Sequence, residues 1–111
     1  MERYSEFQWL YYLIVIGKDS RLNVWHLALL SALAQLAYVQ KEGKIIHVSR
    51  SKLMEKSHIS TIPTYHKYFK QLQELGYIKY TPSYHPAYRS IVELLIFSDF
   101  QNHPLQMTKG L

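Results

Sequence analysis

Two helix-start signals lie close together near the middle of this 111-residue chain, and they constrain its fold more than any other feature. Ser49 is a good N-cap for a short helix of about residues 50–57. Ser60 or Thr61 can cap a second helix, in which Pro63 is tolerated because the first turn needs no internal N–H partner. The sequence therefore predicts two helices joined by a tight turn.

The second helix of this pair has one apolar face. Tyr65, Phe69 and Leu72 follow one another at intervals of four and three residues, which is the spacing of a core-facing helical stripe. Gly76 comes four residues later, and we expect it to end the helix. Ile59, in the turn before the helix, is expected to be buried.

Three short runs have the composition of strands. They are residues 45–48, 77–80 and 90–97, which are rich in Ile, Val, Leu and Tyr. Residues 81–89 contain two prolines and predict a hairpin loop between the last two strands.

The first forty residues are apolar and predict two further helices. Residues 4–16 could form a helix or a buried strand, because a short apolar run does not distinguish the two periods, and we favour a helix that stops at Gly17. Asn23 is a good N-cap for a helix over about residues 24–40, which Gly43 is expected to close. The predicted fold class is therefore α+β and mostly helical.

Composition narrows the class of protein. With 48% hydrophobic and 19% charged residues, the chain is too apolar to be disordered, and its length suits a single domain. The absence of cysteine excludes disulfide scaffolds, thiolate metal sites and cysteine nucleophiles.

Positive charge is concentrated in the middle of the chain. Residues 41–89 hold nine Lys and Arg against three Asp and Glu, whereas residues 1–40 are balanced and residues 90–111 are slightly acidic. A basic segment of this kind favours a polyanionic partner, nucleic acid before an anionic membrane. The alternative is a solvated basic surface.

The order of these elements resembles that of the winged helix-turn-helix DNA-binding proteins of bacterial transcription regulators. The likeness covers roughly residues 24–97 and rests on three pieces of sequence: residues 48–54 (VSRSKLM), 59–61 (IST) and 65–78, whose end LQELGYI is the most specific. It implies a single domain over residues 1–111, made of an N-terminal extension with an extra helix (1–22), a core of three helices with a β-hairpin wing (23–97) and a tail (98–111). The turn is about one residue longer than is usual in these proteins.

Several residues are candidates for contact with DNA. The stripe opposite the apolar face of the second helix is cationic, and a helix of this kind fits the major groove. We expect DNA contacts from Thr64, His66, Lys67 and Lys70. Each lysine could instead lie on a solvated helix face, and Thr64 could instead help to cap the helix.

Other candidates come from the preceding helix and the loop. Arg50, Ser51 and Lys52 lie at a helix N-terminus, where backbone N–H groups favour a phosphate, so they should position the DNA. In the loop, His85 and Arg89 are possible donors, and Arg89 could enter a minor groove or hold its backbone. The loop could equally be an exposed turn whose tyrosines pack on the sheet.

Other classes of function find little support in the sequence. The six histidines lack metal-ligand spacing, and no catalytic motif is present, so we predict a non-enzyme with no metal, cofactor or small-molecule ligand. The longest apolar run, residues 24–39, is too short and too polar to span a bilayer, and residues 1–16 do not read as a signal peptide. We therefore expect a cytoplasmic protein without a membrane partner.

These observations predict sequence-specific binding of double-stranded DNA by a transcription regulator. We expect a homodimer formed through the apolar N-terminal third, which has no net charge, because that segment carries more apolar surface than the core is expected to cover. Two alternatives remain open: an accessory DNA-binding factor of a mobile element, acting in excision or replication, and a winged helix used for protein–protein contact.

Overall fold

The computed structural model describes residues 6–85 and 89–95. Over these residues the chain forms α1 (Glu6–Gly17), α2 (Val24–Gln40), β1 (Ile45–Val48), α3 (Arg50–Ser57), α4 (Ile62–Glu74), β2 (Ile78–Thr81) and β3 (Ser90–Leu94). The described fold is therefore α+β and mostly helical, as the sequence predicts. The first segment is a helix, which decides between the two alternatives left open for residues 4–16.

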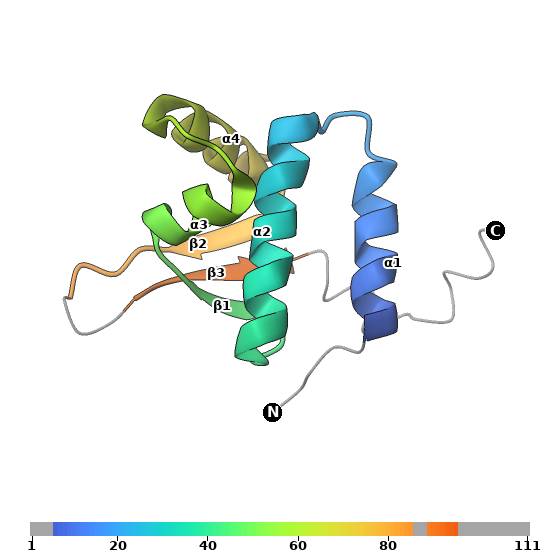
Figure 1. The fold of residues 1–111 in the computed structure, drawn as a ribbon, viewed down its shortest axis with the longest axis horizontal. Coiled ribbons are helices and arrows are strands. Elements are labelled where there is room, and N and C mark those ends of the chain that lie inside the picture. Colours follow the sequence, from blue (N-terminus) through green and yellow to red (C-terminus); the bar gives the residue numbers. More distant parts are fainter. Residues whose placement is uncertain (1–5, 86–88, 96–111) are drawn as a thin grey trace.

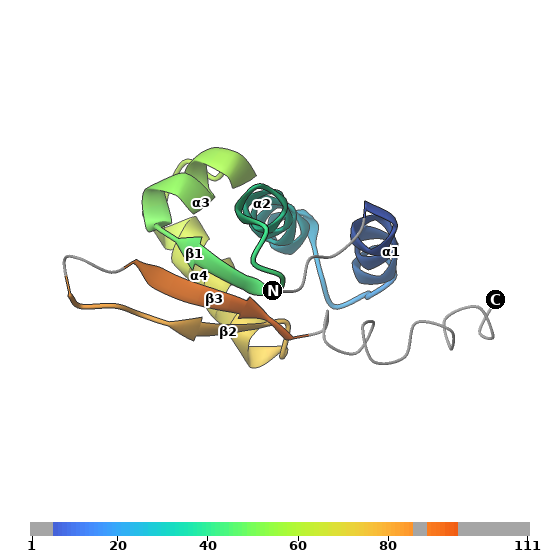
Figure 2. The same ribbon diagram turned by 90° about the horizontal axis from the view of Figure 1, so that it is seen from below.

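Helix α2 is the centre of the fold. It contacts α1, α3, α4 and β1, and α1 runs beside it in the opposite direction (Figure 1). Both views place α1 at one end of the molecule, whereas the segment that follows β2 projects at the other end (Figures 1 and 2). The surfaces at these two ends are thus separated by the body of the fold.

The three strands form one antiparallel sheet in the order β1-β3-β2. Val92 in the central strand lies opposite Ile46 of β1 and Tyr80 of β2. The expected hairpin between the last two strands is confirmed, and β3 ends at Leu94, earlier than the strand over residues 90–97 that the composition indicated. Residues 96 and 97 of that prediction lie outside the described residues.

The start of α2 is fixed by a reciprocal cap. The side chain of Asn23 accepts hydrogen bonds from the backbone of Trp25 and His26, which confirms the predicted N-cap. In return, Nδ1 of His26 accepts the backbone N–H of Asn23 at 2.9 Å, so the proton of the neutral ring lies on Nε2, which donates to Oε1 of Gln71 at 2.6 Å. His26 is buried, and it joins α2 to α4.

The end of α2 differs from the sequence-based expectation. Lys41, and not Gly43, takes the left-handed conformation that stops the helix, with φ of 60°, and its N–H donates to the carbonyl of Ala37. Gly43 adopts a positive φ of 68° two residues later, where the chain turns into β1. The expected role of Gly76 after α4 is supported by its φ of 85°.

The helix pair forms as the caps indicate. Ser49 Oγ accepts the backbone N–H of Lys52 at 3.2 Å, and Ile59 in the turn is buried. Thr61 is the N-cap of α4, although its side chain makes no hydrogen bond to the backbone. Its hydroxyl instead donates to Thr64 Oγ1 at 2.8 Å.

One apolar core holds the helices and the sheet together. The predicted stripe of α4 is buried in this core, which also takes side chains from every other described element: Tyr12 and Ile16 of α1, Leu29, Leu30 and Leu33 of α2, Ile46 and Val48 of β1, Leu53 of α3, Tyr65, Phe69 and Leu72 of α4, Ile78 of β2, and Val92 and Leu94 of β3. Burial of these side chains is the main source of stability.

A polar contact joins the loop between α1 and α2 to the residue directly before β2. Asp19, between α1 and α2, forms an ion pair with Arg21 (Oδ2 to Nη2, 2.7 Å) and accepts a hydrogen bond from the hydroxyl of Tyr77. Tyr77 is buried directly before β2. The hydrogen bonds from Arg21 and Tyr77 hold the pKa of Asp19 well below its ordinary value.

This contact should make stability sensitive to acid. Because the pKa of Asp19 is lower in the folded than in the unfolded state, where it is about 3.9, its contribution is present above that pH and is lost as the pH falls through the folded-state pKa. We expect Asp19→Asn to be less stable than the wild type at neutral pH and to lose less stability on acidification. Urea unfolding at about pH 7 and about pH 2.5 measures this difference, with Tyr77→Phe expected between the two. Equal acid sensitivity of all three proteins would contradict the linkage.

Candidate nucleic-acid interface

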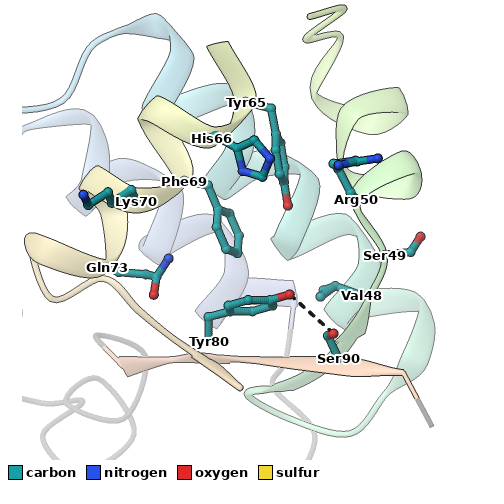
Figure 3. A pocket seen from close by; sticks show the side chains of 10 residues that line it. All are labelled: Val48, Ser49, Arg50, Tyr65, His66, Phe69, Lys70, Gln73, Tyr80 and Ser90. Atoms are coloured by element: carbon teal, nitrogen blue, oxygen red, sulfur yellow. Dashed lines mark hydrogen bonds between the residues drawn. The ribbon is translucent and has the colours of Figure 1, made fainter. Parts of the chain in front are cut away.

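A hollow opens where α3, α4 and the sheet meet. It has a volume of about 420 Å³ and is lined by residues from the end of β1 through the start of α3, from α4, and from β2 and β3: Val48, Ser49, Arg50, Tyr65, His66, Phe69, Lys70, Gln73, Tyr80 and Ser90 (Figure 3). The sides are formed by α4 and by the beginning of α3, and the sheet lies below (Figure 3).

Three aromatic rings form its floor. Tyr65 and Phe69 are stacked with ring centroids 5.3 Å apart, and Phe69 meets Tyr80 edge to face at 5.1 Å. The hydroxyl of Tyr80 donates to Ser90 Oγ at 3.4 Å, which ties the floor to β3 (Figure 3). The aromatic contacts are characteristic of well-packed cores, so the hollow has a rigid base.

The rim of the hollow is positive. Arg50 comes from the first residue of α3, and His66 and Lys70 come from successive turns of α4. None of the described lining residues is acidic. Burial raises the pKa of Tyr65 to about 12, the neighbouring Tyr80 adds to this rise and Arg50 opposes it, so Tyr65 stays neutral at physiological pH and does not offset the rim charge.

The structure brings together three of the nine predicted site residues in this hollow: Arg50, His66 and Lys70. His66 is exposed and packs edge to face against Tyr65, with ring centroids 5.4 Å apart. Arg50 and Lys70 are also exposed. Residues that are twenty positions apart in the chain therefore contribute to one cationic surface.

Lys67 is placed differently from Lys70. Its ammonium group lies 5.2 Å from the ring centroid of Tyr68, a cation–π contact. Tyr68 is also stacked against Trp25 at the start of α2, with centroids 6.2 Å apart. Lys67 is thus exposed beside Tyr68 and lies outside the lining of the hollow.

The other predicted residues of the helix pair lie near α3 and the first turn of α4. Lys52 is exposed and pairs with Glu55 at 3.6 Å, and Ser51 lies 3.5 Å from Ser49 through their hydroxyl oxygens. Thr64 is half-buried and accepts the hydroxyl proton of Thr61, which fits the capping alternative for this residue.

The two predicted loop residues are exposed. The backbone N–H of His85 donates to Ser83 Oγ at 3.4 Å, and Arg89 lies just before β3. They flank residues 86–88, which lie outside the described part of the chain.

Sequence reasoning missed four polar residues of the hollow. Gln73 follows Lys70 by three positions on the same helical face, so extending the cationic stripe by one turn would have found it. For Ser49 the sequence indicates only a capping role. Tyr80 and Ser90 come together through the pairing of β2 with β3, and neither has a local signal for a site.

Within residues 6–85 and 89–95, no three His, Cys, Asp or Glu side chains are grouped so that they could hold a metal ion. In the same ranges none of the helices combines the length and hydropathy needed to cross a bilayer. No match to this chain was found among protein-family models, curated proteins or solved structures.

Proposed function

We propose that this chain is a winged-helix protein that binds double-stranded DNA and acts as a transcription regulator. The observation that carries the proposal is the hollow at the junction of α3, α4 and the hairpin, which Arg50 lines from α3 and His66 and Lys70 line from α4 (Figure 3). A cationic concave surface beside an exposed helix matches the two needs of a DNA-binding protein, a fixed grip on the backbone and an element that enters a groove.

The positions of the basic residues indicate which of them would contact the phosphate backbone and which would contact the bases. Arg50 lies at the N-terminus of α3, where the helix dipole also favours an anion, so it is suited to a phosphate. Lys70 and His66 line the same hollow and would hold the same stretch of backbone. Lys67 is exposed outside the lining of the hollow, and we assign it to the base edges of the major groove, where lysine donates to guanine.

The exposed residues beyond β2 fit the role of a wing. This segment projects from the end of the molecule opposite α1 (Figures 1 and 2). Arg89 and His85 lie at its two described ends and are both exposed, so they are available to a neighbouring groove.

The test is the salt dependence of binding to duplex DNA. If Arg50 and Lys70 each hold a phosphate, about two condensed cations are released, and log K should fall by about 1.8 per tenfold increase in salt, at about 0.9 per phosphate. Fluorescence anisotropy with a labelled duplex, selected from a random pool, measures this slope. Binding that does not respond to salt, or no binding at roughly 50–100 mM salt, would overturn the proposal.

A further inference from the structure

Helix α1 exposes an apolar face. Leu10, Leu13 and Ile14 are 56%, 43% and 48% exposed, although the opposite side of the same helix buries Tyr12 and Ile16 in the core. Leucine and isoleucine at successive positions of one helical face form a continuous apolar surface, whereas scattered exposed apolar residues need no explanation.

A shallow groove runs beside this face, between α1 and α2. It has a volume of about 210 Å³, and its lining is mostly apolar: Trp9 and Leu13 from α1, and Ser31, Ala34, Gln35 and Tyr38 from α2. Two of the four α2 residues in this lining, Ser31 and Ala34, have small side chains, so a leucine-sized side chain from another helix can approach the backbone between Gln35 and Tyr38 on one side and α1 on the other. The molecule thus presents a ridge, Leu10–Ile14, next to a groove that can accept such a ridge.

The charge distribution indicates what covers this surface. Between Gln8 and Gly17, and throughout α2, there is no Asp, Glu, Lys or Arg, although the whole chain carries a net charge of +5. A partner of opposite charge would gain no ion pairs here. Two copies of a cationic chain, however, repel each other least where they meet through an uncharged face, because a two-fold interface places the same patch on both sides.

We propose that the groove between α1 and α2 binds α1 of a second copy of this chain. In this isologous arrangement the Leu10–Ile14 ridge of each copy lies in the groove of the other, and the four helices form a bundle. The hollow at α4 is lined by none of the residues that line this groove, so the interface does not use the hollow. This assembly does not depend on DNA binding.

The experiment is sedimentation velocity of the full chain over a range of micromolar concentrations. We expect the wild type to have the mass of two chains, and Ile14→Glu to have the mass of one. Ile62→Glu is the matched control: Ile62 is 44% exposed at the start of α4, so the substitution, the exposure and the change in charge are similar, and the two-chain mass should persist. Leu13→Ala, with the milder loss of one ridge side chain, should raise the dissociation constant about tenfold, which corresponds to the burial of a few methyl and methylene groups.

Circular dichroism of each variant shows whether its helical content equals that of the wild type, so that a misfolded variant is recognised. If Ile14→Glu does not fold, Leu13→Ala and the wild type still decide the question. A wild-type mass of one chain at every concentration overturns the proposal, and so does a two-chain mass that Ile14→Glu leaves unchanged. A dimer that forms only after residues 96–111 are removed also overturns it, because the chain itself would then occupy the groove.

Discussion

Replacing Arg50, Lys67 and Lys70 together by alanine will weaken binding to duplex DNA by on the order of 60-fold at 0.1 M salt through the phosphate contacts of Arg50 and Lys70, because each lost phosphate contact removes about 0.9 log units at that concentration. Loss of the base contact of Lys67 adds to this at a preferred site. The slope of log K against log salt will become shallower by about 1.8 in the same variant. All three side chains are exposed at or beside the hollow, so their removal should leave the fold intact. Titration of one labelled duplex at several salt concentrations measures both quantities.

The control variant removes the same net charge elsewhere. Lys18, Lys41 and Lys56 lie at the end of α1, at the end of α2 and in the last turn of α3, and none of them lines the hollow. Replacing these three by alanine should change binding by less than about tenfold, since only the long-range attraction is reduced. Equal losses in the two triple variants would show that net charge, and not this surface, attracts the DNA.

Single variants then separate the two kinds of contact. Lys67→Ala should lower affinity at a preferred site more than at unrelated sequences if Lys67 reads a base, whereas Lys70→Ala should lower both alike if Lys70 holds a phosphate. Their different surroundings, the ring of Tyr68 for Lys67 and the hollow for Lys70, are the reason to expect different behaviour.

Local signals predicted the helices well, because caps and periodicity act over a few residues. Asn23 and Ser49 cap α2 and α3 where the sequence indicates, and the interval of Tyr65, Phe69 and Leu72 identifies the buried face of α4. The same locality explains the difference at the end of α2. An unbranched residue such as lysine can take the left-handed conformation at the end of a helix, so the glycine two positions later did not reveal that Lys41 would take it.

Features that depend on distant residues could not be predicted in this way. Nothing in the composition of residues 45–48 indicates that this strand pairs with β3, forty-five positions further along the chain, or that β3 is the central strand. Tyr80 and Ser90 enter the hollow through this sheet. The cationic stripe was readable from helical periodicity, but the division between Lys67 and Lys70 depends on the packing of α2 beside α4, which places Tyr68 against Trp25.

Leu33→Ala will lower the free energy of unfolding by about 2–5 kcal/mol. Leu33 is fully buried in α2, the helix that contacts α1, α3, α4 and β1, so the side chain is enclosed by several elements that cannot all move to fill the space. The loss combines the transfer of about three methyl or methylene groups, at about 0.8 kcal/mol each, with the energy of the cavity that remains.

Urea unfolding followed by tryptophan fluorescence measures this change, with all proteins at one concentration so that any self-association affects them equally. Val39→Ala is the control on the same helix: Val39 is 70% exposed, so its replacement should alter the free energy of unfolding by less than about 0.5 kcal/mol. Alanine favours the helix at both positions, which means that only burial distinguishes them. A similar small change in both variants would mean that the core around Leu33 relaxes into the space, and that α2 is not the rigid centre on which α4 and its hollow are positioned.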